Sequence, residues 1–148
     1  MSLEIIISDA IKDAMRAKDK IALDALRAVK SQILLVKTEA KGADVSAEQE
    51  IAILQRMIKQ RKDSFDQFTA QNRSDLAEVE QAQSTIIEKF LPQQLSTEEL
   101  ESEIKKIISQ TGAESAKDVG KVMGMASKAL AGKSDGKSIS DMAKKLLS

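Results

Sequence analysis

The stretch Leu91-Pro92-Gln93-Gln94-Leu95-Ser96 decides how the chain divides. Pro92 is the only proline among the 148 residues. Its ring blocks the continuation of a helix and biases the residue before it toward extended geometry. The serine that ends the stretch forms a capping-box pattern with the glutamate three residues further on, a typical helix start. The stretch therefore predicts a boundary between an N-terminal domain, residues 1–91, and a C-terminal domain, residues 92–148.

Upstream of this boundary, four segments have apolar residues at helical spacing. The first runs from about Leu3 to Ala17, the second ends before Gly42, the third follows Ser46 and the fourth begins near Ser74. Serine is a typical N-cap and glycine a typical helix end. Apolar residues of the second segment alternate in steps of four and three, so we expect the first two helices to pack antiparallel.

Downstream of the boundary, the pattern predicts three shorter helices. The first reaches Gly112, the second spans about residues 116–131, and the third follows an Asp135-Gly136 turn with Ser138 as its expected N-cap. Aromatic residues make up 2% of the chain and hydrophobic residues 42%. Such an aliphatic composition favours helices over sheets. The sequence therefore predicts an all-α fold, with about four long helices in the first domain and three in the second.

The composition excludes several kinds of active site. The chain contains no cysteine and no histidine. Thiol nucleophiles and zinc–thiolate sites are therefore absent, as are the commonest general base and the commonest metal ligand. We expect no catalytic residue, no metal site and no cofactor, and we do not expect the chain to be an enzyme by itself.

The charge of the chain and its N-terminal residues limit which partners and which cellular location the sequence predicts. The 23 basic and 23 acidic residues give a net charge of zero, so global charge does not attract nucleic acid or membranes. No segment approaches about 18 consecutive apolar residues, and the N-terminus lacks the pattern of a secretory signal. The absence of cysteine fits a reducing compartment. The sequence therefore predicts no membrane association and a cytoplasmic location.

Five of the six glycines lie between residues 112 and 136. Gly120 and Gly124 share one face of a predicted helix, where each costs about 1 kcal/mol relative to alanine. Two explanations stay open, close helix–helix packing and close approach of a ligand, and we favour packing. The tripeptide Gly132-Lys133-Ser134 is not a nucleotide-binding P-loop, because position 127 is serine instead of the required glycine and no strand precedes it.

The sustained positive charge of the chain lies at its end. Residues 113–148 contain seven lysines and four acidic residues, a net charge of +3, whereas residues 98–111 have a net charge of −2. Lysines beside small residues suit contact with phosphate and ribose better than reading of base edges. On charge alone, a domain that only packs and binds no ligand is as well supported as a nucleic-acid-binding domain. A second basic pair, Arg27 and Lys30, lies one turn apart on the second helix, where a solvated face is the favoured interpretation.

These motifs resemble those of the YqeY-like proteins, free-standing relatives of the tail domain of the B subunit of glutamyl/aspartyl-tRNA amidotransferase. The resemblance covers essentially the whole chain. It rests on Leu26-Arg27-Ala28-Val29-Lys30-Ser31 with Glu39, Lys59-Gln60-Arg61-Lys62-Asp63-Ser64, Arg73-Ser74-Asp75-Leu76, Leu91-Pro92-Gln93-Gln94-Leu95, Gly120-Lys121-Val122-Met123-Gly124, Gly132-Lys133-Ser134-Asp135-Gly136 and Lys144-Lys145-Leu146-Leu147. The chain departs from the family pattern at Asn72, Gln83 and Ser134.

The resemblance implies a helical N-terminal domain and a three-helix tail domain that contacts tRNA, while ammonia generation and amide formation take place elsewhere in the amidotransferase. The expected nucleic-acid-binding residues are Lys121, Lys133, Lys137, Lys144 and Lys145 with Gly120, Gly124 and Gly136, and the secondary basic patch is Arg27 with Lys30. The expected partner is tRNA or a tRNA-handling enzyme. Two alternatives remain: a helical adaptor for protein partners, and an accessory role in the carbon–nitrogen ligase reaction of the amidotransferase, with glutamine as amido donor.

Overall fold

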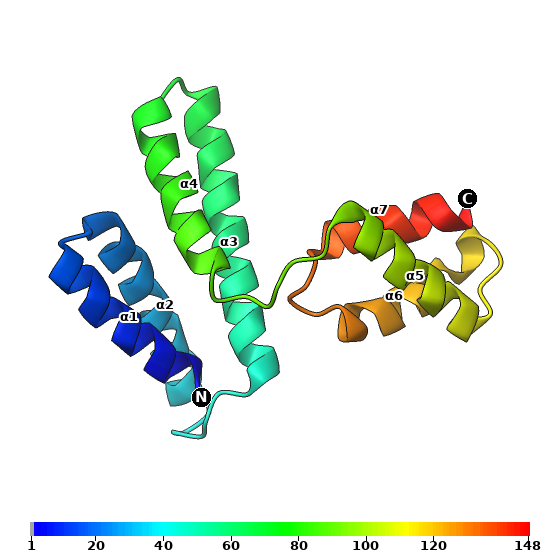
Figure 1. Cartoon of the computed structure of the whole chain (residues 1–148), viewed down its shortest axis with the longest axis horizontal. Coiled ribbons are helices and arrows are strands. Elements are labelled where there is room, and N and C mark those ends of the chain that lie inside the picture. Colours follow the sequence, from blue (N-terminus) through cyan, green and yellow to red (C-terminus); the bar gives the residue numbers. More distant parts are fainter. Residues whose placement is uncertain (1) are drawn as a thin grey trace. The chain divides into compact units, whose positions relative to one another are not determined.

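The computed structural model describes residues 2–148. Every regular element in that range is a helix, which confirms the all-α prediction (Figure 1). The helices pack into two compact units, Met1–Leu91 and Pro92–Ser148. That each unit folds as a domain by itself stays a prediction. Within the described range, no helix is both long enough and apolar enough to cross a lipid bilayer.

The helix bounds lie close to those that the sequence predicts. The helices of the N-terminal unit are α1 (Leu3–Ala17), α2 (Lys20–Glu39), α3 (Ala47–Ala70) and α4 (Ser74–Glu88). Those of the C-terminal unit are α5 (Thr97–Thr111), the short 3-10 turn η1 (Ala116–Asp118), α6 (Val119–Ala129) and α7 (Gly136–Leu147).

The N-terminal unit consists of two helical hairpins, α1–α2 and α3–α4 (Figure 1). The ammonium of Lys37 near the end of α2 lies 3.1 Å from the carboxylate of Glu4 at the start of α1. This ion pair confirms the predicted antiparallel packing. The apolar core of the N-terminal unit contains residues from all four helices, and Ile7, Val29 and Ile87 are fully buried in it. The hydrophobic stripes of the helices therefore set the arrangement of this unit.

The start of α1 is held by an acidic residue from another helix. The Glu50 carboxylate of α3 accepts a hydrogen bond of 2.8 Å from the backbone N–H of Leu3. A negative charge at this end also favours the partial positive charge of the helix dipole. Glu50 thus ties the chain's first helix to the third.

The predicted N-caps divide into two that are confirmed and two that are wrong. Ser46 and Ser96 are N-caps, and each hydroxyl accepts from the backbone N–H three residues later. Ser74 is instead the first helical residue of α4. Asp135, not Ser138, caps α7, because its carboxylate accepts the Ser138 N–H at 3.1 Å. The Asp135 carboxylate thus accepts a hydrogen bond from a backbone N–H in the first turn of α7, where the helix itself offers no partner.

Ser84 is the buried polar side chain of the N-terminal unit, at 1% exposure. Its hydroxyl has no hydrogen-bond partner among the described residues. We expect Ser84→Ala to stabilise the protein by about 1 kcal/mol, because a buried, unpaired hydroxyl loses its water without compensation. The thermal unfolding midpoint measures this effect. The control is Thr85→Ala, since Thr85 is exposed; a drop in stability for Ser84→Ala alone would contradict the prediction.

Candidate nucleic-acid interface

The interior of the C-terminal unit fixes which side of α6 meets solvent. Ile104 of α5, Val122 and Ala126 of α6, and Ala143 of α7 are fully buried in one apolar cluster. The two α6 residues are four apart, so they lie on the same face of that helix. Residues on the opposite face of α6 must therefore point to solvent.

Gly120 and Gly124 lie away from this apolar cluster, and both are exposed. Apart from chain neighbours and their own helix backbone, no heavy atom lies within 4 Å of the point where a Cβ would stand. The prediction that these glycines serve helix–helix packing is therefore wrong. The reason is the register of α6, because Val122 and Ala126 take the inward positions. The glycines leave a stretch of bare helix backbone open to solvent.

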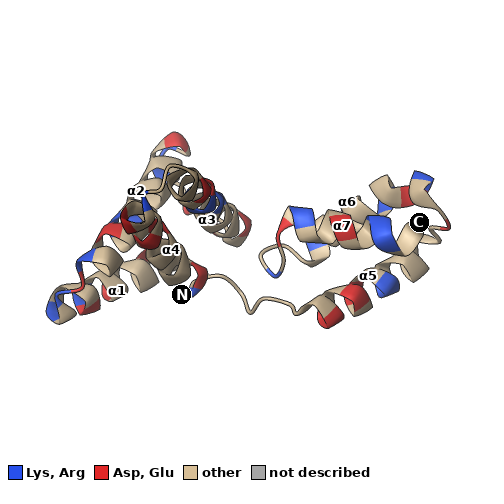
Figure 2. Ribbon diagram, turned by 90° about the horizontal axis from the view of Figure 1, so that it is seen from above, with Lys and Arg blue, Asp and Glu red and all other residues tan. Residues whose placement is uncertain are grey.

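The lysines of residues 113–148 are exposed and have no ion pair in the part of the chain that the structure describes. Among the described residues, none of the following lies within 4 Å of a carboxylate: Lys117, Lys121, Lys128, Lys133, Lys137, Lys144 and Lys145. By contrast, Lys105 of α5 pairs with Glu101 at 3.2 Å, and Lys106 pairs with Glu103 at 3.3 Å. Figure 2 shows the acidic start of α5 and the basic residues of α6 and α7. The positive charge of this unit is thus available on α6, α7 and the loop between them.

Lys121 sits beside the turn that starts α6. In that turn, the Asp118 carboxylate accepts a hydrogen bond of 3.0 Å from the backbone N–H of Glu114. This bond lowers the pKa of Asp118, and the nearby positive charge of Lys121 lowers it further. The carboxylate therefore stays ionised and braces the turn, while the Lys121 ammonium has no carboxylate of residues 2–148 within 4 Å.

The predicted lysines occupy different places in the C-terminal unit. Lys121 is on α6, Lys133 is in the loop before α7, and Lys137 and Lys144 are on the exposed side of α7. Gly136, the first residue of α7, is exposed with open space around it, like the two glycines of α6.

Lys145 is one of the residues that line a shallow cleft of about 300 Å³. Its neighbours there include the hydroxyl residues Thr97, Ser134 and Ser138 and the apolar residues Leu95, Leu100 and Met142. Because Lys144 does not line this cleft, the structure separates two lysines that are adjacent in sequence.

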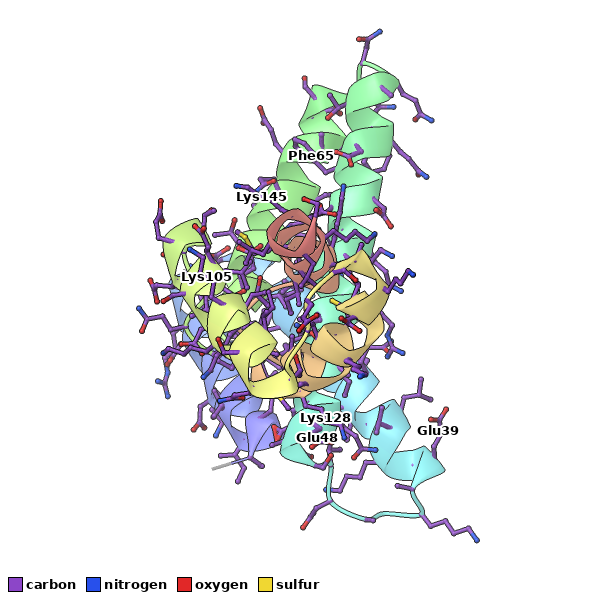
Figure 3. All side chains as sticks on the ribbon, turned by 90° about the vertical axis from the view of Figure 1, so that its right-hand side faces the viewer. Glu39, Glu48, Phe65, Lys105, Lys128 and Lys145 are labelled. Carbon is purple, nitrogen blue, oxygen red and sulfur yellow. The ribbon has the colours of Figure 1, made fainter. Side chains whose placement is uncertain are left out.

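Two exposed lysines without an ion pair among the described residues, Lys117 and Lys128, are missing from the residues predicted from the sequence. Lys128 is exposed and lies seven residues after Lys121, which places both on one side of α6 with Gly124 between them. Its side chain is labelled in Figure 3, together with those of Lys105 and Lys145. The four- and three-residue steps along Lys121, Gly124 and Lys128 were the signal that could have identified it.

The secondary basic patch belongs to the other unit. Arg27 is exposed and Lys30 is half-buried on α2, and neither has an ion pair among the described residues. Nearby arginines have structural contacts instead. Arg56 of α3 donates to the Gln32 side chain of α2 at 3.2 Å, and Arg61 donates to Gln83 of α4 at 3.3 Å. These arginines link helices, and sequence analysis did not predict their contacts.

Comparison with known proteins gives a family match over almost the full chain. The model of the family described as Yqey-like protein matches residues 5–147. Similar proteins include "Altered inheritance of mitochondria protein 41, mitochondrial" of Lachancea thermotolerans, 31% identical over 68% of this chain and 54% of the relative. The protein of that name in Saccharomyces cerevisiae strain YJM789 is 33% identical over 66% of this chain and 54% of the relative. Its counterpart in Meyerozyma guilliermondii is 34% identical, over 79% and 67%.

These matches correct one prediction and limit what the names imply. The relatives are named as mitochondrial proteins, so the cytoplasmic location predicted from the sequence is contradicted. The prediction was wrong because a lack of cysteine and of a secretory signal fits several compartments. The chain spans about half the length of the first two relatives. Their names state no substrate and no binding partner.

Proposed function

Because the chain belongs to the YqeY-like family, we propose that its C-terminal unit binds tRNA as a non-catalytic accessory to tRNA metabolism. The observation that carries this proposal is the contrast between the lysines of one small unit. Those of α5 are neutralised by glutamates of the same helix, whereas those of α6, α7 and the connecting loop have no ion pair in the described residues.

Unpaired lysines are suited to phosphate contacts. Each phosphate that a lysine neutralises releases condensed counterions, which makes binding strongly dependent on salt. Lys121 and Lys128 stand on either side of the bare backbone at Gly124. A ribose–phosphate chain can approach the helix backbone closely at Gly124, since only space lies where its Cβ would stand. The unit contains no aromatic residue, so base stacking contributes nothing to this mode of binding.

Charge reversal at two lysines tests the proposal. We expect Lys121→Glu with Lys133→Glu to weaken tRNA binding by roughly 25- to 60-fold at about 0.1 M salt, because two phosphate contacts are lost. Fluorescence anisotropy of labelled tRNA with the full chain, at about 50 and about 200 mM salt, measures both affinity and its salt dependence. In the double variant, the slope of log affinity against log salt concentration should become less steep by about 1.4–1.8.

A matched control separates local contacts from overall charge. Lys105→Glu with Lys106→Glu changes the net charge equally within the same unit, at lysines that are already paired. We expect this variant to bind tRNA nearly as the unchanged chain does. Equal loss in both variants would show only a net-charge effect, and salt-insensitive binding or no binding by the unchanged chain would contradict the proposal.

A second candidate function is a helical adaptor for a protein partner. The N-terminal unit exposes large apolar side chains on its first two helices, including Ile5 at 52%, Leu34 at 43% and Leu35 at 52%. Exposed apolar residues on adjacent helices are typical of protein contacts. If this function holds, a discrete complex or oligomer in solution should be disrupted by Leu34→Glu with Leu35→Glu. If the chain instead has an accessory role in transamidation, conversion of Glu-tRNA(Gln) or Asp-tRNA(Asn) by purified amidotransferase should change when the chain is added.

A further inference from the structure

Two hydrogen bonds join the segment before α5 to the loop between α6 and α7. The side-chain amide of Gln94 donates to the backbone carbonyl of Gly132, which lies 38 residues away. The backbone N–H of Leu95 donates to the carbonyl of Lys133 at 2.9 Å. The Gln94 amide also donates to the Pro92 carbonyl at 2.9 Å. Because an amide NH₂ has two hydrogens, Gln94 uses both of them to hold its own segment and the distant loop together.

One of the two loop residues that accept these hydrogen bonds is Lys133, which has no ion pair among the described residues. The Lys133 N–H donates to the Leu130 carbonyl at 2.9 Å, so both backbone polar groups of Lys133 are hydrogen-bonded. Gly132 before it is buried and has a φ of +77°, a left-handed conformation that glycine adopts without strain. The backbone on both sides of Lys133 is therefore fixed, while its side chain is exposed.

We propose that Gln94 is a positioning residue for Lys133. Together with the Leu95 N–H, it forms a clasp that fixes the loop backbone from which the Lys133 side chain reaches a phosphate. The proposal that the ligand is tRNA rests on the proposed function above, whereas the clasp itself does not. A loop whose backbone is held before binding loses less conformational entropy when its lysine meets a ligand. Lys121, Lys128, Lys137 and Lys144 gain such order from their helices, but Lys133 lies outside any helix and depends on the clasp.

The chain supplies a matched control for this residue. Gln93 is the same residue type one position earlier, is exposed, and has no side-chain hydrogen bond among the described residues. Gln94→Ala removes the donor. Gln94→Glu keeps the size but places an ionised acceptor opposite the Gly132 carbonyl, so it also abolishes the clasp. Because Gln94 is itself exposed, both variants should retain the helical content of the unchanged chain.

The clasp can be tested without any ligand, by amide hydrogen exchange in the full chain. We expect exchange of the Leu95 N–H to accelerate about 10-fold in Gln94→Ala and Gln94→Glu, as loss of one supporting hydrogen bond predicts. It should be unchanged in Gln93→Ala. Unchanged exchange at Leu95 in both Gln94 variants would overturn the clasp.

A double-mutant cycle with tRNA then tests whether the clasp acts through Lys133. We expect Lys133→Ala to weaken binding by about 5- to 8-fold, the effect of one phosphate contact, and Gln94→Ala to weaken it by roughly 2- to 8-fold. Combining them should cost no more than Lys133→Ala alone. Independent, multiplicative losses would overturn the positioning role. If the unchanged chain fails to bind tRNA, the proposed function falls, and the exchange measurement still decides whether the clasp exists.

Discussion

The variant Ile104→Ala is expected to unfold the C-terminal unit and to leave the N-terminal unit folded. Ile104 is fully buried at the centre of the apolar cluster that joins α5, α6 and α7. Replacement of a buried isoleucine by alanine costs about 2–5 kcal/mol, and a domain of this size has little stability in reserve. In an amide NMR spectrum, signals from α5, α6 and α7 should collapse, while those from α1 to α4 keep their dispersion.

This experiment also tests whether the boundary at Pro92 separates two independent domains. Lys105→Ala is the control, because Lys105 is the exposed neighbour of Ile104 on the same helix. It should leave both sets of signals in place, since a surface change of this kind rarely exceeds about 0.5 kcal/mol. Loss of both units together in Ile104→Ala would contradict the two-domain prediction.

The second large effect is expected for Gly120→Ala combined with Gly124→Ala. Both glycines lie inside α6 with open space where a methyl group would stand. Each alanine should therefore stabilise the helix by about 1 kcal/mol, which together raises the unfolding midpoint of so small a unit by roughly 8–16 °C. The methyl group at position 124 covers the bare backbone between Lys121 and Lys128, and the one at position 120 covers the backbone just before Lys121, so we expect tRNA binding to weaken. Calorimetry and anisotropy on one variant measure the two opposite changes.

The control for this pair is Gly132→Ala. Gly132 has a φ of +77°, so alanine there should destabilise the protein by about 1–2 kcal/mol. Replacing glycine by alanine should therefore raise the stability at positions 120 and 124 and lower it at position 132. Lower stability after the change at Gly120 and Gly124 would show that another segment packs on this face. Higher stability with unchanged tRNA binding would remove the glycine face from the interface.

Local sequence signals predicted the helices because helix ends are decided locally. Ser46 and Ser96 cap helices as predicted, and Gly112 ends α5 with a φ of +69°. Caps depend on hydrogen bonds within a few residues, and helical spacing of apolar residues marks the buried face. The prediction failed where two nearby residues could each cap the same helix. At α7 the N-cap is Asp135 instead of the predicted Ser138.

The candidate site was predicted in its residue types but not in its arrangement. An excess of lysine near the end of the chain is visible in the composition. Sequence alone did not show that the α5 lysines are neutralised and the others are not, because ion pairing depends on side-chain geometry. It also left the exposed Lys117 and Lys128 out of the candidate residues.

By itself, the sequence determined that the chain is helical, roughly where its helices begin and end, and that it contains neither cysteine nor histidine. These properties follow from residue type and short-range spacing. Only the tertiary structure decided that Gly120 and Gly124 face solvent, because the packing of α6 on its neighbours fixes which of its faces is outward. It alone brought Gln94 to Gly132, since a contact across 38 residues depends on how the three helices pack and not on any local preference.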